Sequence, residues 1–214
     1  MKNFITAGTL LALATVSLTS CYDRDRDPMP EYSSVALVNA TLDPATATIP
    51  LLPARAAAAT NPTRPEIRFT IDLYSQRDTK VSKVFVYRTL RRGSTAAVYS
   101  YSPRFLLAEV TTFPTTLTFN SQQLLTDMVR LTTDANTGAV TAVPYIPPTA
   151  TAVNRIFTGD TFIFTYEYEL ENGQRIVLTP TTKQTSSSPT TQAYETITGS
   201  QINAPYALVV PIRQ

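Results

Sequence analysis

Apolar and polar residues alternate along several short segments of the chain, which is the pattern of β-strands with one buried face. The strongest signal covers residues 161–170, where aromatic residues alternate with threonine and glutamate. Residues 66–74 show the same period, with isoleucine, phenylalanine and leucine opposite charged or hydroxyl side chains. Residues 81–90 form a third such segment, rich in valine. The pattern therefore predicts a protein built mainly from short strands.

Turn residues and shorter alternating runs place the remaining strands. Arg92-Gly93-Ser94 is predicted to turn the chain into a hairpin after residues 81–90, and Asn172-Gly173 to do the same after residues 161–170. The Asn-Gly dipeptide is typical of a type I′ turn, in which both central residues have positive φ. The further predicted strands are residues 34–39, 96–101, 105–111, 115–119, 174–179 and 206–212.

One segment has a helical period. Asn120 is a suitable N-cap, Gln123 stands at the third helical position of a capping box, and apolar residues then recur at three- and four-residue spacing. This pattern predicts one short helix over about residues 121–131. Three segments without a regular period are predicted as loops: the Pro- and Ala-rich residues 43–65, the Pro-containing residues 139–160 and the Ser/Thr-rich residues 181–191.

Short strands with polar turns and a single helix favour two packed antiparallel sheets, an all-β, immunoglobulin-like β-sandwich. An open barrel is the alternative. We expect one sandwich domain over residues 34–214, since this length is enough to bury a sizeable core.

The first residues have the layout of a secretory signal. Lys2 is followed by an apolar run of small and aliphatic residues that is shorter than the ~20 needed to span a membrane. The run ends in Leu18-Thr19-Ser20-Cys21, which resembles the lipobox of bacterial lipoproteins. We therefore expect a signal peptide over residues 1–20, lipid on Cys21 as the link to a membrane, and a charged, proline-bearing tether over residues 21–33.

Composition limits the chemistry. The 18 basic and 16 acidic residues nearly balance and form no basic block, which argues against nucleic acid as a partner. The chain contains no histidine, the commonest general base near neutral pH and a frequent metal ligand. Cys21 is the only cysteine, so no intramolecular disulfide can form. We expect no catalytic residues, no metal and no cofactor, and hence a protein that is not an enzyme.

Two patterns that could carry chemistry have simpler interpretations. Glu167 and Glu169 share one face of a predicted strand, and Asp72 or Glu109 could approach them to form the paired carboxylates of a glycosidase. Glutamates on the polar side of an alternating strand are usually solvated, which favours a structural interpretation. Asp134-Ala135-Asn136-Thr137-Gly138 begins like a calcium loop, but Tyr145 stands where the bidentate glutamate belongs, so a turn is expected.

A group of tyrosines is the candidate binding surface. Tyr87, Tyr99 and Tyr101 lie on or beside the hairpin predicted from residues 81–101, and flat rings can pack on sugar faces or peptide side chains. Arg91 and Arg92 at its solvated tip could add contacts to an acidic partner. The alternative is that these rings pack within the sandwich.

The order of several segments resembles small surface lipoproteins of Bacteroidota that have immunoglobulin-like domains. The segments are Val84-Phe85-Val86-Tyr87, Thr112–Phe119, Gly159–Phe164 and Glu171-Asn172-Gly173. Such proteins accompany SusC/SusD-type nutrient-uptake systems. The resemblance implies an outer-membrane, cell-surface binding or accessory module that captures glycan or peptide, with the periplasmic face as the alternative location. A structural or adhesive surface protein that binds other proteins is the alternative function.

Overall fold

The structure is a computed structural model that describes residues 37–74, 80–93, 100–198 and 207–214. The signal peptide, Cys21 and the tether lie outside these residues, as does Tyr99. Residues Val35–Gln214 form one compact unit.

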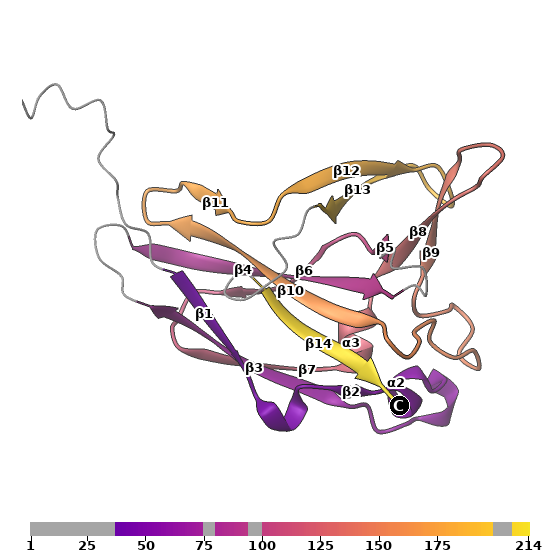
Figure 1. Cartoon of the computed structure of the whole chain (residues 1–214), viewed down its shortest axis with the longest axis horizontal. Helices are drawn as coiled ribbons and strands as arrows, with labels where there is room; N and C mark the ends of the chain where they lie inside the picture. Colours follow the sequence, from indigo (N-terminus) through magenta and orange to yellow (C-terminus); the bar gives the residue numbers. More distant parts are fainter. Residues whose placement is uncertain (1–36, 75–79, 94–99, 199–206) are drawn as a thin grey trace, which may run out of the picture. The chain divides into compact units, whose positions relative to one another are not determined.

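The largest of the four sheets in the described residues runs through the middle of this unit (Figure 1). Its strands are, in spatial order, β2 (Ile49–Pro50), β14 (Ala207–Arg213), β10 (Thr161–Leu170), β4 (Val81–Arg92) and β5 (Ser100–Tyr101), while β11 (Arg175–Val177) pairs with β10 and β6 (Phe105–Val110) pairs with β4. All pairs are antiparallel except β2 with β14. The strands predicted near residues 66–74, 81–90, 105–111, 115–119, 161–170, 174–179 and 206–212 are present.

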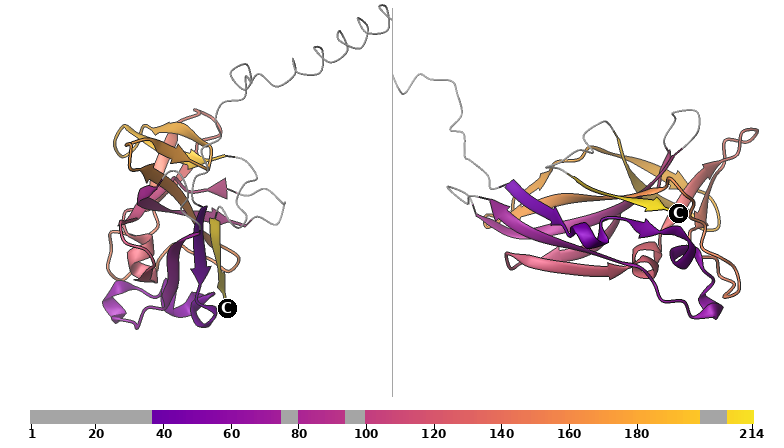
Figure 2. Two further views of the ribbon diagram at one scale, coloured as in Figure 1. Left: turned by 90° about the vertical axis from the view of Figure 1, so that its left-hand side faces the viewer. Right: turned by 60° about the horizontal axis from the view of Figure 1, so that its bottom comes forward.

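The second sheet packs against the first and closes the core. It consists of β1 (Leu37–Leu42), β3 (Glu66–Tyr74) and β7 (Thr115–Asn120), with β3 in the centre (Figure 2). Phe69 of β3 and Phe164 of β10 are both fully buried, with ring centroids 5.2 Å apart. An all-β sandwich, expected from the sequence, is confirmed.

The first strand extends beyond the predicted range of residues 34–39. It reaches Leu42, and within it Leu37 is 49% exposed and Val38 is buried. β1 begins at Leu37, and its neighbour β3 sets which side chains face the core. Because side chains alternate at every residue, a shift by one exchanges the two faces.

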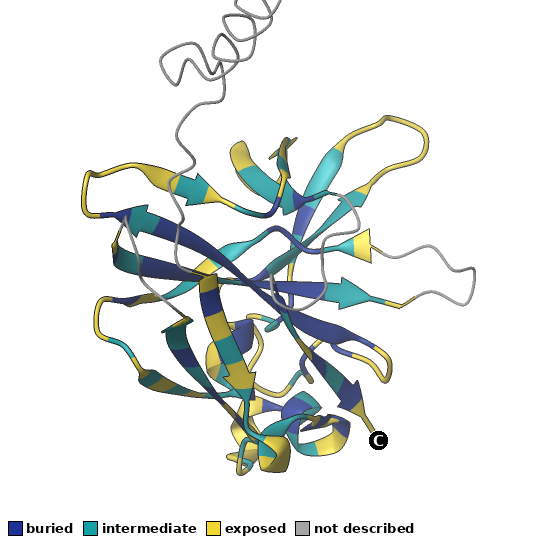
Figure 3. Cartoon of the chain, turned by 60° about the vertical axis from the view of Figure 1, so that its left-hand side comes forward, coloured by how far each residue is buried: buried dark blue, intermediate teal, exposed yellow. Residues whose placement is uncertain are grey.

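Strand β10 is buried on both faces, which corrects a second expectation. Thr165 and Glu167, predicted to face solvent, are 1% and 2% exposed, and the strands crossing the middle of the unit are coloured as buried along most of their length (Figure 3). A hairpin of β12 (Thr181–Ser186) and β13 (Gln192–Ile197) lies over this face, where Ile197 packs with Ile163. The prediction of a loop over residues 181–191 was therefore wrong for β12, because threonine-rich segments also form strands readily.

The predicted helix is much shorter than residues 121–131. The capping box of Asn120 and Gln123 is present, but α3 spans only Ser121–Leu125. Asp127 has a φ of 60°, which ends the helix, and the buried Arg88 donates to the carbonyl oxygens of Gln123 and Thr126. The chain continues as a hairpin of β8 (Val129–Thr133) and β9 (Val140–Pro144) where a helix end and a loop were expected.

Residues 43–65 are not a plain loop. They contain two short 3₁₀ turns, η2 (Pro44–Thr46) and η3 (Ala58–Thr60), the strand β2 and the helix α2 (Leu51–Arg55). Ile49, Leu51 and Ala54 join the core, and this burial orders a segment whose sequence lacks a period. α2 and α3, with five residues each, are the longest helices of the described part of the chain, and none there is long and apolar enough to cross a membrane.

The Asn172-Gly173 hairpin is present with a different turn. Only Gly173 has positive φ, at 80°, so the turn is not type I′. Gly173 N–H donates to the Leu170 carbonyl and Leu170 N–H donates to the Gln174 carbonyl, each over 2.9 Å. These bonds describe a three-residue loop with glycine in the left-handed position.

Candidate functional site

The structure distributes the predicted binding residues over two faces of β4. Tyr87 and Arg91 lie on the face that β12 and β13 cover, whereas Arg92 has the opposite parity and points the other way. Tyr101 lies opposite Arg91 in the β4–β5 pair and packs against the small cluster of Ile163, Ile197 and Ala207. Tyr99 lies outside the described residues. A shared binding role of the three tyrosines stays a prediction.

Tyr87 is held by charged neighbours. Its hydroxyl accepts a hydrogen bond from Arg175 Nη2 at 2.5 Å and lies 3.4 Å from Glu167 Oε2, to which it can donate. The Arg104 guanidinium lies 4.4 Å from the ring centroid. Burial raises the pKa of Tyr87, and the charge of Glu167 adds to this effect. The Tyr87 ring therefore has less exposed surface for a ligand than we expected from the sequence.

Glu167 is the centre of a closed ion cluster with Arg104, Arg175 and Glu195. Arg104 pairs with Oε1 of Glu167, and Arg175 Nε contacts Oε2 at 2.7 Å. Arg104 Nε also donates to Glu195 Oε2 at 2.8 Å. Two guanidinium groups thus balance two carboxylates, and both oxygens of Glu167 are engaged. The expectation that Glu167 is solvated was wrong.

This cluster is suited to holding strands together. It joins β10, β11, β13 and the residue before β6 through ionic hydrogen bonds. A second carboxylate facing Glu167 across an open cleft, as glycosidases require, does not come from Asp72, which belongs to the other sheet. Glu109 pairs with Lys83 at 2.9 Å. Similarly, Asp134 Oδ1 accepts the backbone N–H groups of Asn136 and Thr137, which confirms the expected turn.

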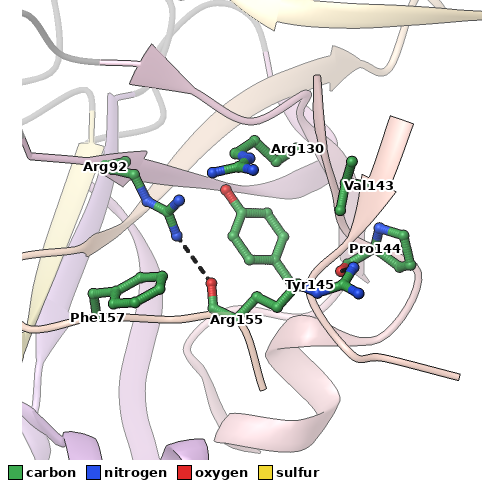
Figure 4. Close-up of a pocket in the computed structure, with 7 residues that line it drawn as sticks. All are labelled: Arg92, Arg130, Val143, Pro144, Tyr145, Arg155 and Phe157. Atoms are coloured by element: carbon green, nitrogen blue, oxygen red, sulfur yellow. Dashed lines mark hydrogen bonds between the residues drawn. The ribbon is translucent and has the colours of Figure 1, made fainter. Parts of the chain in front are cut away.

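A different group of residues lines a small cavity near the end of β4, which we call the arginine pocket (Figure 4). Its volume is about 110 Å³. The lining residues are Arg92, Arg130, Val143, Pro144, Tyr145, Arg155 and Phe157. Three guanidinium groups thus meet one phenol and one exposed aromatic ring.

Each arginine of the pocket comes from a different segment of the chain. Arg92 ends β4, donates from Nη2 to the Arg155 carbonyl at 2.9 Å and lies 4.6 Å from the Phe157 ring centroid. Arg155 follows β9 along the chain and donates from Nη1 to the Pro144 carbonyl at 2.9 Å. Arg130 comes from β8, and its side chain has no hydrogen bond or ion pair with another described residue. The fold thus positions two of the three guanidinium groups and leaves the third uncommitted.

Asp160 is the carboxylate that accompanies these arginines. It is 2% exposed, accepts the Phe157 N–H at 3.0 Å and lies 3.4 Å from Arg92 Nε. Burial raises the pKa of Asp160, and the positive charge of Arg92 counters part of that rise. With Asp160 ionised, three guanidinium groups face one carboxylate within the described residues, so the pocket carries excess positive charge.

Tyr145 supplies a neutral donor beside these charges. The side chain is almost fully buried, and burial raises the pKa of Tyr145 to about 12. Its phenol oxygen points toward the guanidinium of Arg130 (Figure 4). The hydroxyl is therefore protonated at neutral pH and can donate a hydrogen bond.

The sequence pattern indicated only Arg92 among the pocket residues, and placed it at a solvated tip. Arg92 is instead 20% exposed and paired with Asp160. Arg130 stood in the predicted helix, and Tyr145, Arg155 and Phe157 in a predicted loop, so no local signal joined them. Residues 129–157 approach Arg92 only through the tertiary fold.

The described residues contain no group of three or more His, Cys, Asp or Glu side chains that could hold a metal ion. Comparisons with protein-family models, curated proteins and solved structures found no match.

Proposed function

We propose that the protein is an exported lipoprotein, anchored through lipid on Cys21, that acts as a non-enzymatic binding or accessory module. Its proposed location is the cell-surface face of the outer membrane, where it captures glycan or peptide for a SusC/SusD-like uptake system. The apolar run before Leu18-Thr19-Ser20-Cys21 supports the anchor. The periplasmic face of the same membrane is the alternative location.

The arginine pocket is the observation that carries the binding role. It is concave, and one of its guanidinium groups, that of Arg130, has no structural partner among the described residues. A guanidinium in a concave site whose N–H groups make no hydrogen bond to the described residues can donate them to a ligand. By contrast, both oxygens of the buried Glu167 are occupied by arginines, which leaves that carboxylate poorly suited to accept or deliver a proton.

The test uses the full chain carrying Cys21→Ser, which removes the lipidation site. A glycan array and a peptide library measure binding, and a panel of glycosidase and peptidase substrates measures turnover. Binding to members of one ligand class without turnover is the expected result. Turnover of any substrate would overturn the non-enzymatic proposal.

The alternative function is a structural or adhesive surface protein. The observation that favours it is the edge position of β7, which pairs only with β3 among the described strands and so offers unpaired backbone groups to another chain. A purified protein partner that binds equally well to wild type and to Arg130→Gln would favour this alternative, provided that glycans and peptides do not bind.

A further inference from the structure

The arginine pocket contains more positive charge than its neighbours neutralise. Of the three lining arginines, Arg92 is the one that forms an ion pair with a described residue, the buried carboxylate of Asp160. Arg55 of α2 adds a fourth guanidinium, 5.1 Å from the centroid of the same Phe157 ring that Arg92 contacts. Like charges around one cavity repel one another, and the repulsion is stronger away from bulk water. An anion in the cavity would relieve it.

The donors of these arginines are only partly used. A guanidinium has five N–H groups in a planar fork that matches the oxygens of carboxylate, sulfate or phosphate. Among the described residues, Arg130 donates none of its five, and the side chain of Arg155 donates through Nη1 alone. The Tyr145 hydroxyl also makes no hydrogen bond to a described residue. The Arg130 guanidinium and the Tyr145 hydroxyl thus meet at one cavity, while the Arg155 guanidinium lies beside Pro144 (Figure 4).

The size of the cavity limits what can enter. At about 110 Å³ it is smaller than the ~300–1,000 Å³ of pockets that enclose a whole small molecule. It can hold one functional group of a larger ligand, with the remainder outside. Phe157, which is 45% exposed, lies at the cavity and offers an apolar edge to that remainder.

We propose that the arginine pocket binds the oxyanion group, a sulfate, phosphate or carboxylate, of the captured ligand. This inference rests on the proposed function and adds the chemical class that the site selects: acidic rather than neutral glycans or peptides. Arg130 pairs with the oxyanion, Tyr145 donates a further hydrogen bond, and Arg92, already paired with Asp160, contributes charge.

The experiment titrates the full chain carrying Cys21→Ser with sodium sulfate, sodium phosphate and sodium glucuronate by calorimetry at constant ionic strength. Glucose serves as the neutral probe. Arg130→Gln tests the pocket, because its side chain holds no structural partner among the described residues. Arg68→Gln is the matched control, since it removes the same charge from a 51% exposed side chain in the other sheet.

At least one oxyanion should bind to wild type and to Arg68→Gln, and glucose should not. Arg130→Gln should weaken oxyanion binding about tenfold or more, the effect of losing one charge-assisted contact. No oxyanion binding to wild type, or equal weakening by Arg130→Gln and Arg68→Gln, would overturn the inference.

A second arm identifies the source of the oxyanion and separates this inference from the proposed function. A uronic-acid or sulfated oligosaccharide is compared with an aspartate-rich peptide, and the ligand sensitive to Arg130→Gln is the class captured. If glycans or peptides bind regardless of Arg130→Gln and small oxyanions do not bind, the proposed function stands and the pocket assignment fails. If small oxyanions bind through Arg130 but no glycan or peptide does, the pocket assignment stands and the capture role fails.

Discussion

Arg175 and Glu167 form an ion pair across the β10–β11 hairpin, with Arg175 Nε 2.7 Å and Nη2 2.6 Å from Glu167 Oε2. Arg104 contacts the other carboxylate oxygen from the opposite side. The side chain of Glu167 is 3% exposed, and Arg104 is 9% exposed. One buried anion therefore pairs with two cations, of which Arg104 also pairs with Glu195.

Replacing this anion should destabilise the fold. Glu167→Gln leaves Arg104 with only Glu195 and Arg175 without a carboxylate, and removing one member of a buried ionic group costs about 3 kcal/mol or more. Urea unfolding of the full chain measures the change. Glu109→Gln is the control, because Glu109 is 46% exposed in its pair with Lys83 and should cost less than about 1 kcal/mol. Equal, small losses in both variants would mean that the cluster does not stabilise the sandwich.

The core contact between the two sheets should be costly to remove. Phe164→Ala deletes a ring that is fully buried against Phe69, and such truncations cost about 3–5 kcal/mol. Leu52→Ala is the control, because Leu52 on α2 is 80% exposed. Its unfolding free energy should change by no more than ~0.5 kcal/mol. Denaturant unfolding of both variants checks the register of β10, and a loss below about 1 kcal/mol for Phe164→Ala would contradict it.

The protein should lose stability in strong alkali through Tyr145. Burial holds the folded-state pKa of Tyr145 at about 12, above the ordinary value of 10.0, so unfolding favours release of the proton. The stabilising contribution is complete below pH 10 and is lost as the pH rises from about 10 through about 12. One pKa unit corresponds to ~1.4 kcal/mol, so the loss amounts to roughly 2–3 kcal/mol.

Tyr145→Phe isolates this effect, because phenylalanine keeps the ring and cannot ionise. Unfolding free energies measured between pH 8 and pH 12 should fall less steeply for the variant than for wild type. Burial also raises the pKa of Tyr166 and Tyr87, so part of the alkaline loss should remain. Identical slopes for wild type and Tyr145→Phe would show that Tyr145 ionises as readily when folded.

The membrane association should depend on Cys21, which lies outside the described residues. Each buried CH₂ of an acyl chain contributes ~0.8 kcal/mol, so two or three chains anchor the protein without help from the polypeptide. Cys21→Ser should move the protein from the membrane fraction to the soluble fraction. Intact-mass analysis of the wild type should show a chain that begins at Cys21 and carries lipid, and an unlipidated chain that begins elsewhere would refute the assignment.

Local patterns in the sequence were sufficient for most of the sandwich. The alternation in residues 66–74 and 161–170 identified β3 and β10 and the side chains that meet in the core, because a two-residue period can bury only one set of positions at that interface. The capping residues Asn120 and Gln123 located the start of α3 correctly. The charge balance, the lack of histidine and the position of Cys21 are likewise properties of the sequence alone.

The tertiary structure decided those features of the fold and the pocket that no local pattern in the sequence specifies. The polar face of β10 is buried because β12 and β13 fold over it, and no local period of residues 161–170 encodes that cover. The helix after Leu125 gives way to β8 because pairing with β9 satisfies its backbone, which outweighs a helical spacing of apolar residues. The arginine pocket joins Arg92, Arg130 and Arg155 from three segments separated by up to 63 positions. Convergence of such distant side chains depends on how the strands pair and pack, which is a long-range outcome that local propensity does not specify.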